Sequence, residues 1–206
     1  MEYHSFAMSK LFLKSFLKRP LQVASIIPSS RTLVNRVARR FDFSEPRLVV
    51  ELGPGEGVHT RELVKRMHPE SRMLLFELDD DLVTHLRTQF EKEDRVEVIH
   101  ADAAMLPQEL EKRGWSHCDY VLSGIPFSIL PAEKKRKLIQ GIFEALKPEP
   151  HAAFVIYQVT AELKDHVPMF ARQQSEYCLQ NVPPMFVISF FKLPDGPESE
   201  DPATAR

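Results

Sequence analysis

The chain has 206 residues, 43% of them hydrophobic and 27% charged, which fits one globular domain with a short appendage and excludes disordered and fibrous classes. A net charge of −2 gives no bulk indication of a nucleic-acid binder. Two cysteines, Cys118 and Cys178, are too few for a disulfide framework or a zinc cluster, so we expect a reducing cytoplasm.

The N-terminal segment is strongly basic and amphipathic. Residues 1–40 carry eight Lys and Arg side chains against one acid, Glu2. On a helical wheel, residues 6–19 place apolar side chains on one half and lysines on the other: Phe6, Met8, Phe12, Leu13, Phe16 and Leu17 opposite Lys10, Lys14 and Lys18. This pattern predicts a helix that lies on an anionic membrane surface, although an ordinary helix packed on the domain remains the alternative.

The same segment gives no sign of a helix that crosses a membrane. No apolar run approaches the roughly 18 residues that a spanning helix needs, and Lys10 and Lys14 interrupt any signal-peptide core. We therefore expect a cytoplasmic protein that associates peripherally with the inner face of the membrane.

The tripeptide Pro28-Ser29-Ser30 predicts the start of a second helix, which would run to about Phe41. Serine is a preferred N-cap residue, and the free N–H groups of a first turn attract anions. The sequence leaves open whether Ser29 and Ser30 hold an anionic ligand or only cap the helix.

From residue 47 onward, apolar β-branched runs alternate with helical patterns. The expected strands are residues 47–52, 72–77, 95–100, 118–123 and 152–158, and the expected helices are 58–67, 79–91, 104–113, 131–145 and 161–172. Residues 177–182 and 185–192, separated by Pro183-Pro184, predict an antiparallel hairpin.

These elements predict an α/β fold: a Rossmann-like, doubly wound sheet of seven strands whose last strand is antiparallel, preceded by N-terminal amphipathic helices. The predicted domain covers residues 43–193. Residues 1–42 form the helical appendage that covers the site, and residues 194–206 form an acidic tail that we expect to be disordered.

Three of the chain's seven glycines follow the first strand, in the sequence ELGPGEGV. Glu51, Gly53, Gly55 and Gly57 give the spacing E-x-G-x-G-x-G between a strand and a helix, where glycine permits positive φ and close approach of a ligand. The dinucleotide fingerprint would need glycine at Val58, so the nicotinamide interpretation is weakened. A tight turn without a ligand is the alternative.

Acidic side chains follow the next two strands. Glu77, before Leu78, is placed to accept hydrogen bonds from a ribose diol, whereas Asp79 is expected to cap the following helix. Asp102, before Ala103, is placed equally well to accept from an adenine amine or to cap a helix.

The fourth strand ends in Ser123-Gly124-Ile125-Pro126-Phe127. This composition predicts a rigid turn, with an exposed aromatic side chain beside it, at the sheet edge where open α/β proteins bind ligands. The basic run at residues 134–137 falls on the helix after this turn and is typical of a solvated face.

The motifs ELGPGEG, FELD, HADA and SGIPF, followed by a hairpin, resemble a class I S-adenosylmethionine-dependent methyltransferase over residues 47–192. Within that class the chain resembles the ribosomal RNA adenine dimethylase family and, more closely, the bacterial phospholipid N-methyltransferase family. The features that favour the phospholipid family are Pro28-Ser29-Ser30 and the basic, apolar stretch before it.

Two departures from the RNA enzymes support that preference. Ser123 stands where the RNA family has Asn, so a flipped adenine would lose an amide acceptor. The chain also ends after the hairpin, without the additional helical domain of the RNA family. RNA adenine N-methylation with the same cofactor is the alternative, and a membrane-binding protein without activity is a third hypothesis.

The resemblance implies methyl transfer from S-adenosylmethionine to the amine of phosphatidylethanolamine, giving phosphatidylcholine. The implied cofactor-binding residues are Glu51, Gly53, Gly55, Gly57, Glu77, Leu78, Asp102, Ala103, Ser123 and Ser30. Ser123, Gly124 and Tyr157 are the candidate catalytic residues, and His59 and His100 are further candidate proton acceptors. The expected partners are the phospholipid and an anionic membrane surface, which is contacted by Phe6, Lys10, Phe12, Lys14, Phe16 and Lys18. Neither a metal ion nor nucleic acid is expected as a partner.

Overall fold

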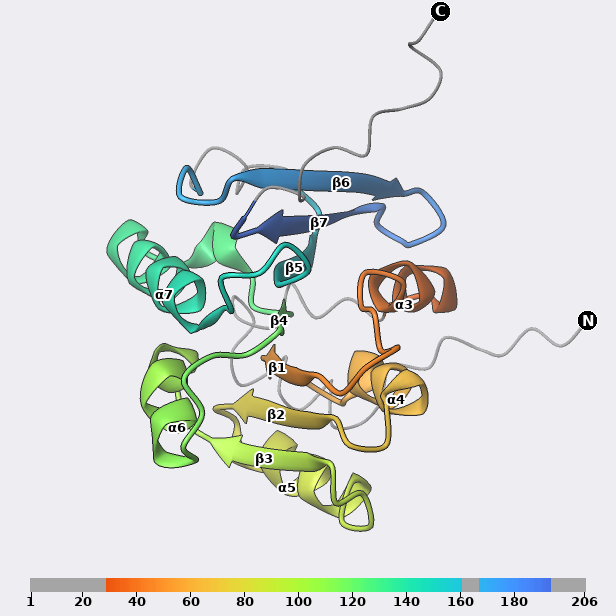
Figure 1. The fold of residues 1–206 in the computed structure, drawn as a ribbon. Helices are drawn as coiled ribbons and strands as arrows, with labels where there is room; N and C mark the ends of the chain where they lie inside the picture. The colour runs from red at the N-terminus through yellow and green to blue at the C-terminus, as the bar shows by residue number, and fades with distance from the viewer. Residues whose placement is uncertain (1–28, 161–166, 194–206) are drawn as a thin grey trace, which may run out of the picture.

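The structure is a computed structural model that describes residues 29–160 and 167–193 (Figure 1). Seven strands form one mixed sheet in the order β3-β2-β1-β4-β5-β7-β6. The bounds of the five parallel strands are β1 Leu48–Leu52, β2 Arg72–Glu77, β3 Val96–His100, β4 Tyr120–Ser123 and β5 Ala153–Gln158. The predicted doubly wound sheet is confirmed, and β7 (Met185–Phe191) runs antiparallel to β5 and to β6.

The last part of the sheet corrects two sequence predictions. The strand expected at residues 177–182 is β6, Arg172–Cys178, which begins five residues earlier. Residues 167–172 are therefore not the end of a helix, while residues 161–166 lie outside the described part of the chain. The reason is the position of β6 at the sheet edge: most of its side chains are exposed and polar, so the usual apolar strand pattern is missing.

Helices cover both faces of the sheet (Figure 1). One face carries α3 (Arg31–Ala38), α4 (Val58–Arg66) and α5 (Asp80–Gln89), whose apolar side chains share a core with β1, β2 and β4. The other face carries the short helix η1 (Ala103–Met105), α6 (Leu106–Lys112) and α7 (Ala132–Ala145), with the short turn η2 (Phe127–Ile129) before α7. Cys118 and Cys178 are both buried and form no disulfide.

Helix α3 is part of this domain rather than a separate appendage, because Leu33, Val37 and Ala38 lie in the same core as the sheet. It ends at Ala38, three residues before the expected Phe41, whose ring leaves the helix to pack on Tyr120. The predicted membrane helix at residues 6–19 and the tail at 194–206 lie outside the described residues.

The β6–β7 hairpin holds the beginning of α3. The amide N–H of Ser30 donates to Oδ1 of Asn181, a side chain with no exposed surface, over 2.8 Å. Arg36 and Arg40 both pair with Glu176 on β6. Residues 29–31 are therefore fixed beside the turn that joins β6 and β7.

Candidate active site at the carboxyl edge of the sheet

The parallel register brings four loops to one edge. Leu52 pairs with Phe76 and with Ser123 at the ends of β1, β2 and β4, and Glu77 pairs with His100 at the end of β3. The residues that follow these strands in the sequence are therefore neighbours in space. This edge is the ligand-binding position in open α/β sheets.

The glycine loop between β1 and α4 has a backbone conformation that residues other than glycine rarely adopt. Gly53, Gly55 and Gly57 have φ angles of 68°, 58° and 69°. A β-carbon in this left-handed region collides with the following carbonyl, so glycine is strongly preferred. Gly57 is also the N-cap of α4, so the loop turns the chain directly into a helix N-terminus.

Glu77 lies directly beside this loop, as predicted. Its Oε2 accepts from the N–H of Gly55 at 3.2 Å, and its Oε1 accepts from the N–H groups of Leu78 and Asp79 at 2.8 and 3.1 Å. Burial raises the pKa of Glu77, and these hydrogen bonds oppose that shift. The predicted cap is confirmed: Asp79 accepts from two amides at the start of α5.

Glu51 presents a buried oxygen without a partner. Its carboxyl group has no exposed surface; Oε2 accepts from the Thr60 hydroxyl at 2.6 Å, while Oε1 has no hydrogen bond among the described residues. Burial, assisted by the charge of Glu77, raises the pKa of Glu51 to about 7. An unpaired buried carboxylate oxygen fits a cationic ligand group such as an ammonium.

The residues after β3 and β2 differ in the groups that they can present to a ligand. Asp102 is exposed, and its Oδ1 accepts from Ala104 N at 2.9 Å, which is the capping arrangement considered from the sequence. Ala103 is buried in the core, so only its backbone can face a ligand. Leu78, with 54% of its surface exposed, is the most accessible apolar side chain at the end of β2.

The turn after β4 packs closely against the glycine loop. Ser123 is buried, and its Oγ accepts from Ile125 N at 3.1 Å, so the hydroxyl stabilises the turn. A β-carbon added to Gly124 would lie 2.6 Å from the Gly53 carbonyl oxygen and 2.7 Å from the Tyr157 hydroxyl. Only glycine leaves room for this contact, which joins the ends of β1, β4 and β5.

One expectation for this turn is wrong. Phe127 is not exposed beside the site: only 1% of its surface is accessible, and its ring packs edge-on against Phe154 in the core. Phe127 begins the short turn η2 directly after Pro126, and its ring points into the core and anchors the turn instead of facing a ligand.

Two histidines that the sequence offered as proton acceptors have different surroundings. His59 is buried, its ring lies 4.3 Å from that of Tyr157, and its Nε2 is 3.0 Å from the Ser29 hydroxyl. Burial lowers the pKa of His59 to about 3 and raises that of Tyr157. His100 is exposed at the end of β3, with Nε2 3.2 Å from the Leu78 carbonyl oxygen.

Sequence reasoning missed two of these residues, Thr60 and Asn181, and one contact, between Ser29 and His59. Thr60 is the partner of Glu51, and the Ser29–His59 contact joins the start of α3 to the glycine loop. Asn181, the buried anchor of Ser30, gave no sequence signal, because it lies 151 positions away from its partner. Ser30 itself caps α3 with its hydroxyl, as expected.

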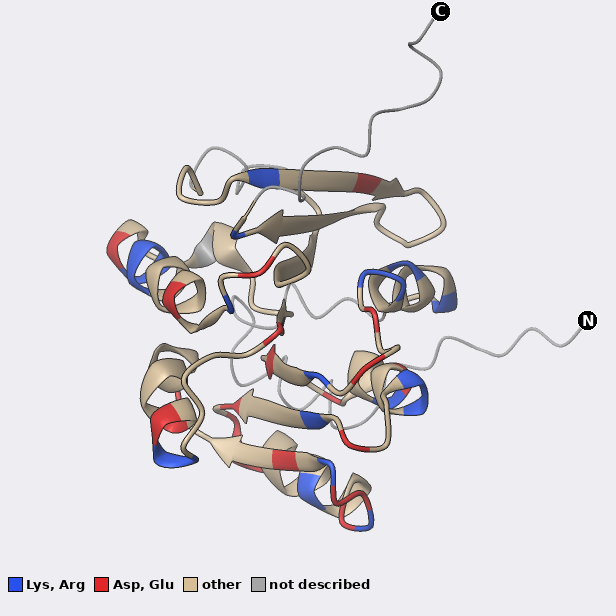
Figure 2. Cartoon of the chain, in the orientation of Figure 1, with Lys and Arg blue, Asp and Glu red and all other residues tan. Residues whose placement is uncertain are grey.

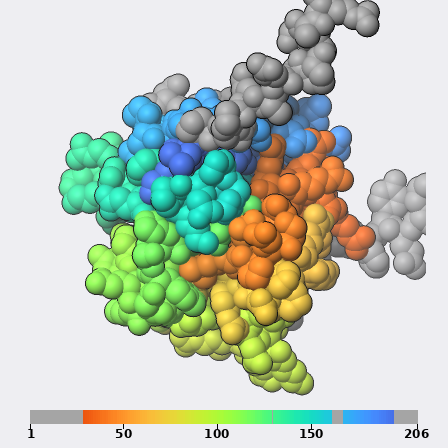
Figure 3. Space-filling model, viewed as in Figure 1, coloured from red at the N-terminus to blue at the C-terminus, as the bar shows by residue number. Residues whose placement is uncertain are grey.

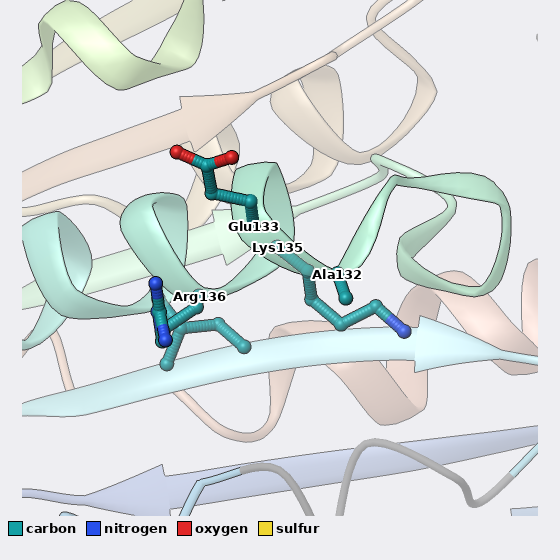
Figure 4. A pocket seen from close by; sticks show the side chains of 5 residues that line it. Ala132, Glu133, Lys135 and Arg136 are labelled. Carbon is teal, nitrogen blue, oxygen red and sulfur yellow. The ribbon is translucent and has the colours of Figure 1, made fainter.

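A separate hollow of about 450 Å³ lies along the first turns of α7. In Figure 4, Lys135 and Arg136 extend to one side of the helix and Glu133 to the other. Its lining contains no residue of the glycine loop or of the β2 and β3 ends: Ala132, Glu133, Lys135, Arg136 and Ile139. The described residues contain no group of three or more potential metal ligands, and no helix among them is long and apolar enough to cross a bilayer.

The fold, glycine loop and acidic strand ends are those of a class I S-adenosylmethionine-dependent methyltransferase. Solved structures show the fold: a methyltransferase for 1,6-didemethyltoxoflavin from Burkholderia thailandensis, solved with S-adenosylhomocysteine, superposes with a TM-score of 0.65 at 14% identity, covering 88% of this chain and 86% of that one. A precorrin-6y C5,15-methyltransferase from Geobacter metallireducens gives 0.61 at 16% identity, covering 81% and 91%. The chain belongs to the ribosomal RNA adenine dimethylase family, whose model matches residues 23–161.

The relatives of this chain are named for two kinds of substrate, a lipid and ribosomal RNA. An ornithine lipid N-methyltransferase from Singulisphaera acidiphila is 36% identical over 138 residues, which are 67% of this chain and 72% of that protein. The ribosomal RNA small subunit methyltransferase A of Mycoplasma capricolum is 32% identical over 103 residues, and an rRNA adenine N-6-methyltransferase of Aeromicrobium erythreum is 41% identical over 78. The alignments span 37% and 22% of these two RNA enzymes.

The cofactor of this protein is S-adenosylmethionine, and the residues present fit it. The unpaired Oε1 of Glu51 suits the ammonium of its methionine portion, Glu77 suits the ribose diol, and the open backbone of the glycine loop suits close approach. The bound cofactor supplies a methyl group on a sulfonium, which a nucleophile can attack directly.

Proposed function

We propose that the protein transfers methyl groups from S-adenosylmethionine to the amine of phosphatidylethanolamine and of its mono- and dimethyl products, giving phosphatidylcholine at a membrane surface. The observation that carries this proposal is the similarity to an ornithine lipid N-methyltransferase, which aligns with two thirds of this chain. The basic, amphipathic N-terminal segment adds support from the sequence.

The site favours catalysis by positioning rather than by a strong base. The lipid ammonium must lose a proton before its lone pair can attack, and burial in this edge favours the neutral amine. With its pKa near 3, His59 stays neutral, and the raised pKa keeps the Tyr157 hydroxyl protonated. We assign to the backbone carbonyls around Gly124 the role of orienting the amine, since the Ser123 hydroxyl already stabilises the turn.

The family description favours a second candidate, N-methylation of adenine in RNA. The geometry of Ser123 argues against it: the side chain is short and buried, and its oxygen accepts from the backbone of the turn. It therefore cannot present the amide oxygen and NH₂ that an asparagine offers to a flipped base at this position.

The test is transfer of a radiolabelled methyl group from S-adenosylmethionine. The acceptors are vesicles of phosphatidylethanolamine with phosphatidylglycerol, vesicles in which ornithine lipid replaces phosphatidylethanolamine, vesicles of phosphatidylglycerol alone, and ribosomal RNA. We expect label in phosphatidylethanolamine. Label only in ornithine lipid would mean that the substrate is a lipid with a different headgroup from the one proposed. Label only in RNA would overturn the proposal.

A further inference from the structure

The turn between β6 and β7 exposes the most accessible large apolar side chains of the described residues. Val182 is 84% exposed and Leu179 67% exposed. Tyr177, 46% exposed, packs against Phe186 at the base of the turn, with ring centroids 4.6 Å apart and the rings tilted by 41°. We call residues 177–186 the hairpin tip. Clustered exposed apolar side chains can mark an interaction site, and here two aliphatic side chains lie at one tip.

The hairpin tip is uncharged and firmly held. Its sequence, YCLQNVPPMF, contains no Asp, Glu, Lys or Arg, and Figure 2 shows the tip without either charge colour. Asn181, fully buried, accepts from Ser30 N and donates to the Pro183 carbonyl at 2.9 Å. The tip therefore presents its apolar side chains on a fixed support, and little conformational entropy is lost on binding.

The hairpin tip lies at the same edge of the sheet as the active site. Phe186, at its end, pairs with Gln158 at the carboxyl end of β5. Val159, the next residue after β5, is also exposed, at 47%. Asn181 contacts Ser30, and the adjacent Ser29 contacts His59 beside the glycine loop. A surface that meets the tip is thus brought to the edge where methyl transfer takes place.

We propose that the hairpin tip inserts into the interface of an anionic lipid bilayer, with Val182 and Leu179 as the inserting side chains. This inference rests on the proposed lipid substrate and names the part of the folded domain that contacts its membrane. Helix α3 lies beside the hairpin (Figure 3) and carries Lys or Arg side chains (blue in Figure 2). Arg31 at its first position and Arg39, its C-cap, are exposed and complement an anionic surface. Tyr177 suits the polar–apolar boundary because its ring is apolar and its hydroxyl is wet.

The shape and position of the tip favour a bilayer over a protein partner. A stable protein interface buries about 1,200–2,000 Å² and needs a broad complementary face, whereas a narrow tip with two aliphatic side chains suits insertion between headgroups. The tip also adjoins Ser29–Ser30, where the predicted membrane-binding segment joins the domain. The hairpin tip and the N-terminal segment would then contact the same membrane.

The first experiment uses the chain's single tryptophan as its own control. Trp115 precedes β4 and lies at the amino edge of the sheet, opposite the hairpin tip. In a Trp115→Phe background, Val182→Trp places the only tryptophan at the tip. With vesicles of phosphatidylglycerol and phosphatidylethanolamine carrying brominated acyl chains, we expect strong quenching of the tryptophan emission from position 182 and little quenching of Trp115 in the wild type.

A flotation experiment measures what the tip contributes to binding. Leu179→Ser with Val182→Ser should weaken binding to the same vesicles by about tenfold or more, because two aliphatic side chains no longer leave water. Leu193→Ser is the matched control: it is 37% exposed and follows β7 at the opposite edge. We expect this variant to float like the wild type.

Three outcomes would overturn the insertion. They are unquenched emission at position 182 in protein that floats with the vesicles, equal flotation of the double variant, and an emission at position 182 that is shielded from aqueous iodide before vesicles are added. The last would mean that this chain or a second copy covers the tip. Methyl transfer to lipid is measured in parallel: insertion without transfer would contradict the proposed function alone, and transfer without insertion would contradict this inference alone.

Discussion

At the scale of single residues, Glu77 is the most informative position in the cofactor site. It accepts three backbone hydrogen bonds at the end of β2 and faces the glycine loop. Glu77→Ala should weaken S-adenosylmethionine binding by about 1.5–3 kcal/mol, the range for hydrogen bonds to a charged group. Calorimetric titration measures this, with Asp80→Ala as the control, because that carboxylate is 90% exposed at the start of α5. An unchanged dissociation constant in folded Glu77→Ala would contradict the ribose role.

The raised pKa of Glu51 predicts how the free energy of unfolding depends on pH. Its ordinary pKa of 4.5 rises to about 7 in the folded protein, so between these values only the unfolded state releases the proton. The free energy of unfolding should therefore lose up to about 3 kcal/mol from this residue as the pH rises through that range. His59 has the opposite sign, since its pKa falls from 6.5 to about 3 and its contribution is lost as the pH falls.

The two effects offset each other in the wild type over much of this range, so a variant is needed to separate them. Urea unfolding of Glu51→Gln and wild type should show a stability difference that shifts in favour of the variant between pH 4.5 and about 8. The shift should approach about 3 kcal/mol. A stability difference that stays constant with pH would mean that burial does not raise the pKa of Glu51.

Gly124 tests the contact between the two loops. Gly124→Ala places a methyl group 2.6 Å from the Gly53 carbonyl oxygen, a backbone atom that cannot move without shifting the glycine loop. We expect it to lower cofactor affinity at least tenfold, because the loop must move to accept the methyl group. Gly141→Ala is the matched control: its added carbon meets only Pro107 at 3.7 Å, and it should stabilise α7 by about 0.5–1 kcal/mol. Equal affinities in thermally stable variants would contradict this account.

The sequence predicts individual residues well where the interaction is local. Asp79 caps α5, Ser30 caps α3, and Glu77 meets the adjacent loop, because each role is set within a few positions or by one strand pair. Phe127 was misplaced because the direction of its side chain depends on how the turn packs on Phe154.

At the scale of elements, the five parallel strands are predictable because both of their faces are buried, which gives short, nearly continuous apolar runs. β6 has no such signal. Gln173, Gln174 and Ser175 are exposed, and the strand is specified by its register against β7, which no local pattern contains.

The junction between α3 and the hairpin carries a stability prediction. Asn181→Ala removes the acceptor for Ser30 N and the donor to the Pro183 carbonyl, both part-buried. We expect the free energy of unfolding to fall by about 1–3 kcal/mol, and Ser30→Ala, which removes only the cap of α3, to cost about 1 kcal/mol. Urea denaturation measures both. A cost for Asn181→Ala smaller than that for Ser30→Ala would show that this junction is not a principal support of α3.

At the scale of the whole molecule, the lysines of the N-terminal segment are expected to attract the enzyme to its membrane. Replacing Lys10, Lys14 and Lys18 with Glu should weaken binding to anionic vesicles by several kcal/mol, taking about 1 kcal/mol for each charge removed and further repulsion for each charge added. Flotation at low and high salt measures this, because exposed charges are screened over about 8–10 Å. Calorimetry of S-adenosylmethionine binding is the control and should change little. Equal flotation of the triple variant and the wild type would mean that the lysines are an ordinary solvated face.

The contact between Ser30 and Asn181 also imposes an order on biosynthesis. The two residues are 151 positions apart, so Ser30 leaves the ribosome long before Asn181 is made. At roughly 5–20 residues per second, that interval is about 8–30 s. Because Ser29 reaches His59 from this junction, the nascent chain acquires the glycine loop early and the neighbouring wall of the active site last. A nascent protein is thus prevented from completing its active site before nearly all of its sheet has been made.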